Sequence, residues 1–299
     1  MMVEAVEKEI VQMVESIGDE QVSQLYKKLP AGKRLRAKLL LKIAKESETS
    51  VKVAAIIELI HAASLLHDDV IDEASSRRGV ASINAIYGNK HAIMLGDILY
   101  SKGYYELTKC DKEIAQTVSD AVTKLSIGEL KDVVLSKQFN FDQNIYMDMI
   151  YKKTAILIEA SAKVGAILGD KKAEDYALYG KNLGLAFQIV DDILDITSDS
   201  KTLGKPALND FVEGKCTLPY IYLYDKLAPQ DKKTLVSYHA KELTPKQQEW
   251  IKEQMHRHQV ITQSFAYAKE LIEQAVDAVK DKGENYLVDI AMQMIEREY

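Results

Sequence analysis

The chain has 299 residues, of which 47% are hydrophobic and 28% are charged, and its formal net charge is −6. This composition supplies enough apolar residues for a large core. The acidic balance argues against general nucleic-acid binding, which needs a basic face. The 2 cysteines have no C-x-x-C spacing and form no disulfide framework, which fits a reducing compartment.

The N-terminal stretch is acidic and amphipathic. It has neither the basic-then-apolar order of a signal peptide nor the Arg-rich character of a transit peptide. No uncharged apolar run reaches about 18 residues, the length that a membrane-spanning helix needs. We therefore expect no membrane span and a cytoplasmic location.

Proline marks the long helices that follow. The five prolines lie at positions 30, 206, 219, 229 and 245, so residues 31–205 contain none. Apolar residues recur at helical spacing across 51–72, 143–168 and 181–196, whereas strand-like alternation is nearly absent. The sequence predicts an all-α fold, a bundle of long helices in a single domain over 1–299.

An acidic motif ends the first of these segments. In "HAASLLHDDVID" (61–72), Asp68 and Asp72 share a helix face one turn apart, and like charges at that spacing cost an isolated helix about 0.2–0.5 kcal/mol. The same spacing returns in "FQIVDDILD" (187–195), which contains Asp191. Two such clusters facing one cavity would hold magnesium, with phosphate and water oxygens completing its coordination. A solvated helix face is the alternative interpretation of each cluster.

Magnesium held by few carboxylates implies a phosphate substrate, which needs cations nearby. Each basic residue alone is typical of a surface, but together they frame the aspartates as a diphosphate clamp would. They are Lys33, Arg34 and Arg36 in "GKRLR", Arg77 and Arg78 in "RRG", Lys153 beside Thr154, and Lys201, Lys205 and Lys215 in the loop 198–215.

The motifs "HDDVIDEASSRRG" and "FQIVDDILD", with "GKRLR" upstream, resemble those of the trans-isoprenyl (polyprenyl) diphosphate synthases over about residues 30–220. The resemblance implies the isoprenoid synthase fold, helices around a deep central cavity, usually in a homodimer. It also implies a prenyltransferase that joins isopentenyl diphosphate head-to-tail to an allylic diphosphate, such as farnesyl or geranylgeranyl diphosphate.

The resemblance also assigns roles to residues. It implies that Asp68, Asp72 and Asp191 bind Mg²⁺, supported by Asp69 and Asp195. The isopentenyl diphosphate pocket would consist of Lys33, Arg36, His61 and Arg78. The allylic diphosphate would be held by Arg77, Lys153, Thr154, Gln188 and Lys205, and among these Lys153 and Lys205 would act with the metal-binding aspartates in catalysis. The family often has a carboxylate or glutamine just after the lysine that corresponds to Lys205, where this chain has Pro206-Ala207. The resemblance therefore does not determine how the loop 198–214 closes.

Rival classes explain less of the sequence. Glu58–His61 and Glu253–His256 are both Glu-x-x-His, as in ferritin-like di-iron bundles, but that interpretation leaves both aspartate clusters unexplained. A terpene cyclase shares the first motif, but its second site normally mixes Asn, Ser or Thr with an acid. A non-catalytic subunit of a heteromeric synthase usually has eroded motifs, whereas these are intact.

Two small residues before the first motif bear on product length. Ser64 and Ala63 lie four and five residues before Asp68, roughly 6–7.5 Å back along the helix axis. In family members that stop early, bulky aromatic residues at these positions act as a floor. Their small size predicts a wall that admits a long product, as in the octaprenyl type. The family resemblance implies a quinone side chain as the use of that product. A short-chain (farnesyl or geranylgeranyl) synthase is the alternative.

Replacing Ala63 by Tyr is expected to leave the first condensation intact and to shorten the product sharply, because the phenol ring would block the growing chain. Chromatography or mass analysis of the products from isopentenyl and farnesyl diphosphates measures this. A product of unchanged length would show that this wall does not line the path of the chain.

Overall fold

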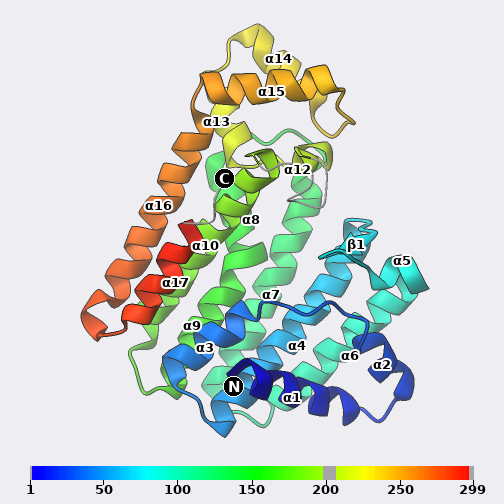
Figure 1. The fold of residues 1–299 in the computed structure, drawn as a ribbon, viewed down its shortest axis with the longest axis vertical. Helices are drawn as coiled ribbons and strands as arrows, with labels where there is room; N and C mark the ends of the chain where they lie inside the picture. Colours follow the sequence, from blue (N-terminus) through cyan, green and yellow to red (C-terminus); the bar gives the residue numbers. More distant parts are fainter. Residues whose placement is uncertain (1, 198–206, 296–299) are drawn as a thin grey trace. The chain divides into compact units, whose positions relative to one another are not determined.

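The computed structural model describes residues 2–197 and 207–295 (Figure 1). The regular elements in these ranges are helices, apart from one hairpin of two short strands. The all-α fold predicted from the sequence is confirmed. By its internal contacts the chain forms two compact units, and the prediction of one domain over 1–299 stays a prediction. The first unit is Met1–Ala121 with Ala160–Glu174, and the second is Val122–Glu159 with Asp175–Tyr299.

The first unit is built around one long apolar helix, α4. Helices α1, α3, α5 and α6 all pack against α4. The elements of this unit, including helices that it shares with the second, are α1 (Met2–Glu15), α2 (Glu20–Tyr26), α3 (Leu35–Ala44), α4 (Glu48–Ile71), β1 (Ser76–Arg77), β2 (Val80–Ala81), α5 (Ile83–Tyr87), α6 (Asn89–Leu107), the start of α7 (Lys112–Leu135), most of α9 (Ile156–Leu168) and the start of α10 (Ala173–Thr197).

The second unit contains the rest of α7, α9 and α10 and the C-terminal helices. In it α13 packs against α8, α15 and α16, and α16 also packs against α17. Its further elements are α8 (Gln143–Ile150), the π-helix η1 (Tyr151–Ala155), α12 (Asn209–Val212), α13 (Leu218–Lys226), α14 (Pro229–Tyr238), α15 (Pro245–Arg257), α16 (Val260–Val279), the 3₁₀ turn η2 (Lys280–Lys282) and α17 (Asn285–Ile295).

Helix α4 begins and ends where its sequence directs. The side chains of Ser47 and Ser50 form a reciprocal capping box at its start, and Asp72 is its C-cap. By length and composition alone α4 could cross a membrane, but 67% of its most apolar window is buried inside the structure. The core helix of a globular unit is buried in the same way, so this one helix is weak evidence for a membrane span. The expectation of no membrane span stays a prediction.

The prolines predicted to mark breaks do so in the second unit. Pro219, Pro229 and Pro245 each stand in the first turn of a helix, at α13, α14 and α15. Proline fits there because the first-turn N–H groups have no partner within the helix.

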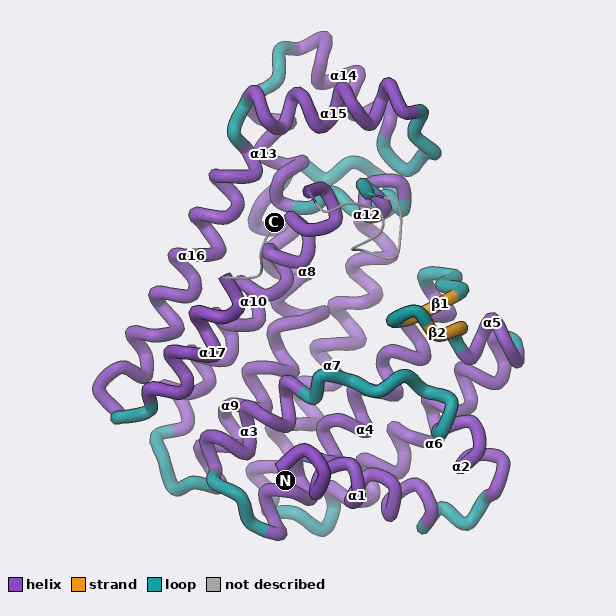
Figure 2. The backbone as a smooth tube through the Cα atoms, in the orientation of Figure 1, coloured by secondary structure: helices purple, strands orange, loops and turns teal. Residues whose placement is uncertain are grey.

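A hairpin follows α4 and is drawn in orange in Figure 2. Ser76 pairs with Ala81 and Arg77 with Val80, so Arg78 and Gly79 form its two-residue turn. Both turn residues have positive φ, 54° and 74°, as a tight hairpin whose strands twist to the right requires. Glycine tolerates this conformation, whereas Arg78 is held in it by the turn.

A buried carboxylate joins α4 to α6. Glu106 is 5% exposed and accepts hydrogen bonds from Lys102 (2.7 Å) and Lys109 (3.0 Å), while Lys52 of α4 lies 3.4 Å away. Burial opposes the charge, but the hydrogen bonds from Lys102 and Lys109 outweigh it and lower the pKa of Glu106 from 4.5 to about 2. The charged form is therefore favoured by folding.

Replacing Glu106 by Gln is expected to destabilise the protein at pH 7, since three ammonium groups lose their carboxylate. Because the folded-state pKa is depressed, the wild-type advantage should be present above about pH 4.5 and should shrink as the pH falls toward 2. Denaturant unfolding of both proteins at several pH values measures it. An equal difference in stability at pH 7 and pH 2.5 would contradict this account.

Candidate active site

The first aspartate motif separates into exposed and buried carboxylates. Asp68 is half-buried and Asp72 is exposed, at the end of α4, where the N–H of Asp72 donates to the carbonyl of Asp68 (2.8 Å). Asp69 is 5% exposed, and Arg77 Nε donates to its Oδ1 (2.7 Å). Burial raises the pKa of Asp69, and the charge and hydrogen bond of Arg77 oppose that rise. Asp69 thus holds Arg77 in place, which fits the supporting role predicted for it.

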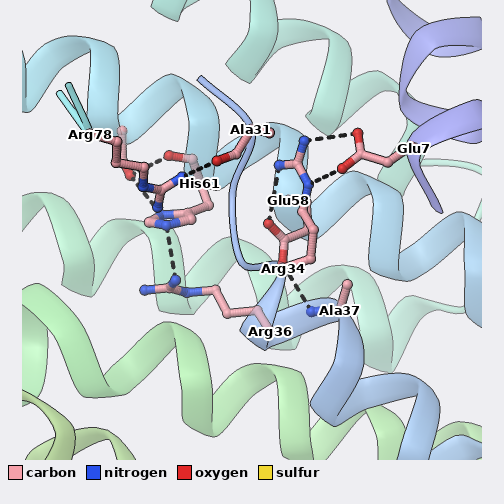
Figure 3. Close-up of polar contacts among 9 residues, drawn as sticks. Glu7, Ala31, Arg34, Arg36, Ala37, Glu58, His61 and Arg78 are labelled. Carbon is pink, nitrogen blue, oxygen red and sulfur yellow. Dashed lines mark hydrogen bonds and ion pairs between the residues drawn. The ribbon is translucent and has the colours of Figure 1, made fainter. Parts of the chain in front are cut away.

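A cluster of guanidinium groups surrounds His61 in the same unit (Figure 3). Arg36 Nη1 lies 2.9 Å from His61 Nε2. Since a guanidinium can only donate, His61 Nε2 accepts, and the proton of the neutral ring sits on Nδ1. Burial and the nearby Arg36, Arg78 and Arg77 lower the pKa of His61 well below 6.5, so the ring stays neutral.

The same cluster leaves a buried donor unused. Arg36 Nε is buried and has no hydrogen-bond partner among the residues that the structure describes. Arg78 Nη1 donates to the carbonyl of Ala31 (3.0 Å), which brings the hairpin to the segment before α3. Lys33, in that segment, is exposed. The structure therefore brings Arg36, His61 and Arg78 together, and the unused donor suits a multiply charged anion. Their role as a diphosphate pocket stays a prediction.

The second aspartate motif, on α10, also contains both exposed and buried carboxylates. Asp191 is exposed, whereas Asp192 is 4% and Asp195 2% exposed. Asp192 accepts hydrogen bonds from Tyr146 Oη (2.5 Å) and Gln188 Nε2 (2.8 Å). Burial and the charge of Asp210 raise the pKa of Asp192 well above its usual range. Asp191 is left as the accessible carboxylate of this motif.

Asp195 is covered by the backbone that follows the loop. Its Oδ2 accepts from the N–H of Asp210 (3.1 Å), and its carbonyl accepts from the N–H of Leu208 (2.9 Å). Asp195 therefore anchors α12 to α10 and is not exposed, and its role in supporting a metal ion stays a prediction.

Lys153 and Thr154 lie in the π-helix η1, a widened turn of the kind often found at functional sites. Lys153 Nζ donates to Asp132 Oδ2 (2.5 Å) and lies 3.0 Å from Glu129 Oε2, both on α7. Burial opposes the charge of Lys153, but these two carboxylates outweigh it and raise its pKa. The two helices meet closely because a Cβ on Gly128 would stand 2.2 Å from the backbone nitrogen of Lys153.

A chain of hydrogen bonds links Thr154 to the second motif. Thr154 Oγ1 donates a hydrogen bond to Gln188 Oε1 (2.7 Å), and Gln188 Nε2 donates one to Asp192 Oδ1 (2.8 Å). The hydroxyl hydrogen of Thr154 is used in this chain, so its oxygen lone pairs remain as acceptors. The structure thus brings Thr154 and Gln188 together, and their predicted role at the allylic diphosphate stays a prediction.

Other predicted residues stand apart from these contacts. Ala63 is fully buried and Ser64 is 4% exposed. They lie along α4 between Ile60 and His67, whose side chains lie against Gly103 and Gly96 of α6. The wall role of Ala63 and Ser64 stays a prediction. Lys205 lies outside the described residues. Within 2–197 and 207–295, no group of three or more His, Cys, Asp or Glu side chains is arranged to hold a metal ion.

Sequence reasoning missed the residues that hold the site residues in place. Glu58 contacts Arg34, Glu129 and Asp132 contact Lys153, and Tyr146 contacts Asp192. The signal available for two of them was the spacing of Glu129 and Asp132, which places both on one face of α7. Nothing in the sequence pointed to Tyr146, because its partner lies 46 residues away.

Comparison with known proteins explains this constellation. Residues 19–256 match the family model described as polyprenyl synthetase. The chain belongs to the polyprenyl synthetase family. It is a prenyltransferase with the all-α isoprenoid synthase fold, as the sequence predicted.

Three similar proteins illustrate the family. The short chain isoprenyl diphosphate synthase of Methanothermobacter thermautotrophicus is 38% identical over 218 residues, 69% of this chain and 67% of that protein. The crystal structure of octaprenyl pyrophosphate synthase from Helicobacter pylori is 42% identical, with a TM-score of 0.94 over 99% of both chains. A polyprenyl synthase from Caulobacter crescentus, complexed with calcium and isoprenyl diphosphate, is 27% identical, with a TM-score of 0.91 over 99% of this chain and 95% of that one.

Replacing Asp132 by Asn is expected to lower prenyl transfer about tenfold, because Lys153 loses one of the two carboxylates that orient it. Steady-state kinetics with the allylic substrate varied measures this. The matched control is Asp148→Asn, which removes a carboxylate from the more exposed pairs with Lys131 and Lys152 and should change activity less than about twofold. Unchanged or raised activity of the Asp132 variant would mean that its carboxylate competes with the substrate for Lys153.

Proposed function

We propose that this prenyltransferase condenses isopentenyl diphosphate head-to-tail with an allylic diphosphate, such as farnesyl or geranylgeranyl diphosphate, in a magnesium-dependent reaction. The observation that carries the proposal is the cluster of Arg36, Arg78 and neutral His61, with a buried guanidinium donor that the described residues leave unused. A diphosphate supplies the oxygens and the negative charge that such a donor needs.

The two diphosphates would use different residues. Isopentenyl diphosphate would bind at Lys33, Arg36, His61 and Arg78, of which the last three are in mutual proximity in the first unit. The allylic diphosphate would bind at Arg77, Lys153, Thr154, Gln188 and Lys205. Support for the second set comes from the contacts that orient Arg77 on Asp69 and Lys153 on Asp132.

The donor chemistry of the two motifs fits a divalent ion. Asp68, Asp72 and Asp191 are the motif aspartates with exposed or half-exposed carboxylates, and hard oxygen donors in small number suit Mg²⁺, which keeps waters and substrate phosphate oxygens. These three residues would hold it, with Asp69 and Asp195 behind them. When bound, magnesium would neutralise charge on the departing diphosphate. The calcium-containing relative supports a divalent ion in this family.

The chain's own residues would assist the loss of the allylic diphosphate. Breaking the allylic C–O bond builds negative charge on the leaving group, and Lys153 and Arg77 would stabilise that charge more than they stabilise the bound substrate. Thr154 donates its single hydroxyl hydrogen to Gln188, so binding the diphosphate would require that hydrogen to turn to a phosphate oxygen. Water has to be excluded so that the cation meets the alkene of isopentenyl diphosphate.

A long-chain product, for a quinone side chain, is our proposal for the outcome. The 42% identity with an octaprenyl pyrophosphate synthase over 99% of both chains supports it, as do the small residues Ala63 and Ser64. A short-chain synthase is the second candidate, favoured by 38% identity to a short chain isoprenyl diphosphate synthase. Product analysis with farnesyl diphosphate as primer separates the two.

The other rival functions have less support. A terpene cyclase would release cyclic hydrocarbons, and a non-catalytic subunit would be inactive when purified alone, so the same product analysis tests both. The di-iron interpretation needed Glu58 as a metal ligand, but the carboxylate of Glu58 is occupied by Arg34 and the backbone N–H of Ala37.

We also propose a cytoplasmic homodimer that binds no nucleic acid. The support for a dimer is an exposed apolar row on α7, formed by Ile127 (41% exposed), Leu130 (64%) and Val134 (55%). A contiguous apolar row on a helix surface is typical of a protein interface. Equilibrium sedimentation tests the dimer, and the mass of a single chain at micromolar concentration would contradict it.

Replacing Asp68 or Asp191 by Ala is expected to lower turnover by orders of magnitude, because each change removes an accessible carboxylate that would bind the metal ion. The helical circular dichroism should change little. Glu73→Gln, which changes an exposed carboxylate next to the first motif, is the matched control and should keep normal activity. Chelation of divalent ions should abolish turnover of the wild type, and added Mg²⁺ should restore it. Near-normal activity of either aspartate variant would overturn the metal assignment.

A further inference from the structure

The segment that carries Lys33 and Arg36 contains a third basic residue with a different fate. Arg34 is the N-cap residue of α3 and adopts the left-handed conformation, with φ 52° and ψ 42°. A non-glycine residue in that conformation is uncommon and is held there by its surroundings. Its side chain is only 11% exposed. Arg34 therefore combines an unfavourable backbone conformation with a largely buried charge.

Two carboxylates from two other helices bind the guanidinium of Arg34 (Figure 3). On one side Glu7 of α1 accepts two parallel hydrogen bonds, from Nε at 2.6 Å and from Nη2 at 2.9 Å. On the other side Nη1 lies 3.4 Å from Oε2 of Glu58 on α4. This forked pairing is the strongest geometry available between an arginine and a carboxylate, and it fixes direction as well as charge.

Glu58 also holds the start of α3. It is 2% exposed, and its other oxygen, Oε1, accepts the backbone N–H of Ala37 at 3.0 Å. A carboxylate at the N-terminus of a helix is favourable because the first N–H groups there have no partner within the helix. The same side chain therefore fixes Arg34 and the first turn of α3, which contains Arg36.

The contacts of Arg34 also set its charge apart from that of its neighbours. Burial opposes the charged form of Arg34, but the hydrogen bond to Glu7 and the charges of Glu58 and Glu7 outweigh it and raise the pKa. Two carboxylates face this one guanidinium, so its positive charge is already compensated. Arg36 differs, because its Nη1 donates to neutral His61 and its Nε has no partner among the described residues.

We propose that Glu7 and Glu58 are positioning residues that act through Arg34. They fix the segment before α3 and the first turn of α3, so that Lys33 in the segment and Arg36 in the turn present their donors to the non-allylic diphosphate. This inference rests on the proposed function and adds to it a role for α1, which contributes no predicted ligand. Arg34 itself is then a structural residue and not a diphosphate ligand.

The test compares Glu7→Gln, Glu58→Gln and Arg34→Lys with the wild type. Each should raise the KM for isopentenyl diphosphate, about fivefold for Glu7→Gln and about tenfold for the other two, because each removes a charged partner or the forked geometry. The kcat and the KM for the allylic diphosphate should stay within about twofold. Glu9→Gln is the matched control, since Glu9 lies on the opposite face of α1, and it should change nothing.

The sign of the effect separates positioning from direct binding. If Arg34 bound the diphosphate itself, removing the charge of Glu7 would free its guanidinium, and the KM for isopentenyl diphosphate would fall. If the contacts served stability alone, the kinetic constants of the folded Glu7→Gln protein would match those of the wild type. Either result would overturn the proposal. The Glu7 side chain is 40% exposed, so this variant should fold even if Glu58→Gln does not.

A second readout does not depend on turnover. Hydrogen–deuterium exchange in the peptide covering residues 33–38 should be faster in Glu7→Gln than in the wild type and unchanged in Glu9→Gln, because the segment loses its anchor. Equal exchange in all three proteins would overturn the positioning role. A wild type that fails to condense isopentenyl diphosphate, while the exchange result holds, would instead refute the proposed function and leave the anchoring of the segment established.

Discussion

Burying a charged side chain costs several kcal/mol unless an opposite charge or hydrogen bonds compensate it. Both units contain such charges at or beside predicted site residues, and their compensation organises each unit locally. Arg34 lies between Glu7 and Glu58, Lys153 between Asp132 and Glu129, and each group is held by partners from other helices. Because one missing partner would leave a buried charge unpaired, these contacts fix the helices as well as the side chains.

The same requirement divides the aspartate motifs into two kinds of carboxylate. Asp69 and Asp192, the second residue of each motif, are both buried and hydrogen-bonded, one by Arg77 and the other by Tyr146 and Gln188. Asp68 and Asp191, the first residue of each motif, keep accessible surface. A buried, hydrogen-bonded carboxylate orients its neighbours, whereas an accessible carboxylate can meet ions from solvent. One short motif therefore contains carboxylates in both environments.

The π-helix η1 shows how close packing helps to place Lys153 within the second unit. Gly128 lets α7 approach the backbone of Lys153 at a distance that no side chain would permit, and this brings Asp132 within hydrogen-bond range of the lysine. The widened turn and the carboxylates that pair with Lys153 are therefore linked features. An account based on ligands alone would overlook the backbone contact that makes their geometry possible.

The sequence by itself determined the helical class, the helix ends marked by prolines, and the residues that could carry the chemistry. Helical periodicity placed Asp68 and Asp72 on one face, because that relation depends only on the spacing along the chain. Asp191 and Asp195 also lie one helical turn apart, but Asp195 is buried beneath α12 whereas Asp191 is exposed. The motif "GKRLR" groups Arg34 with Lys33 and Arg36, but in the structure Arg34 differs from them because Glu7 of α1 and Glu58 of α4 bind its guanidinium. Only the tertiary structure could decide these points, since burial and charge compensation depend on side chains that lie far away in the sequence.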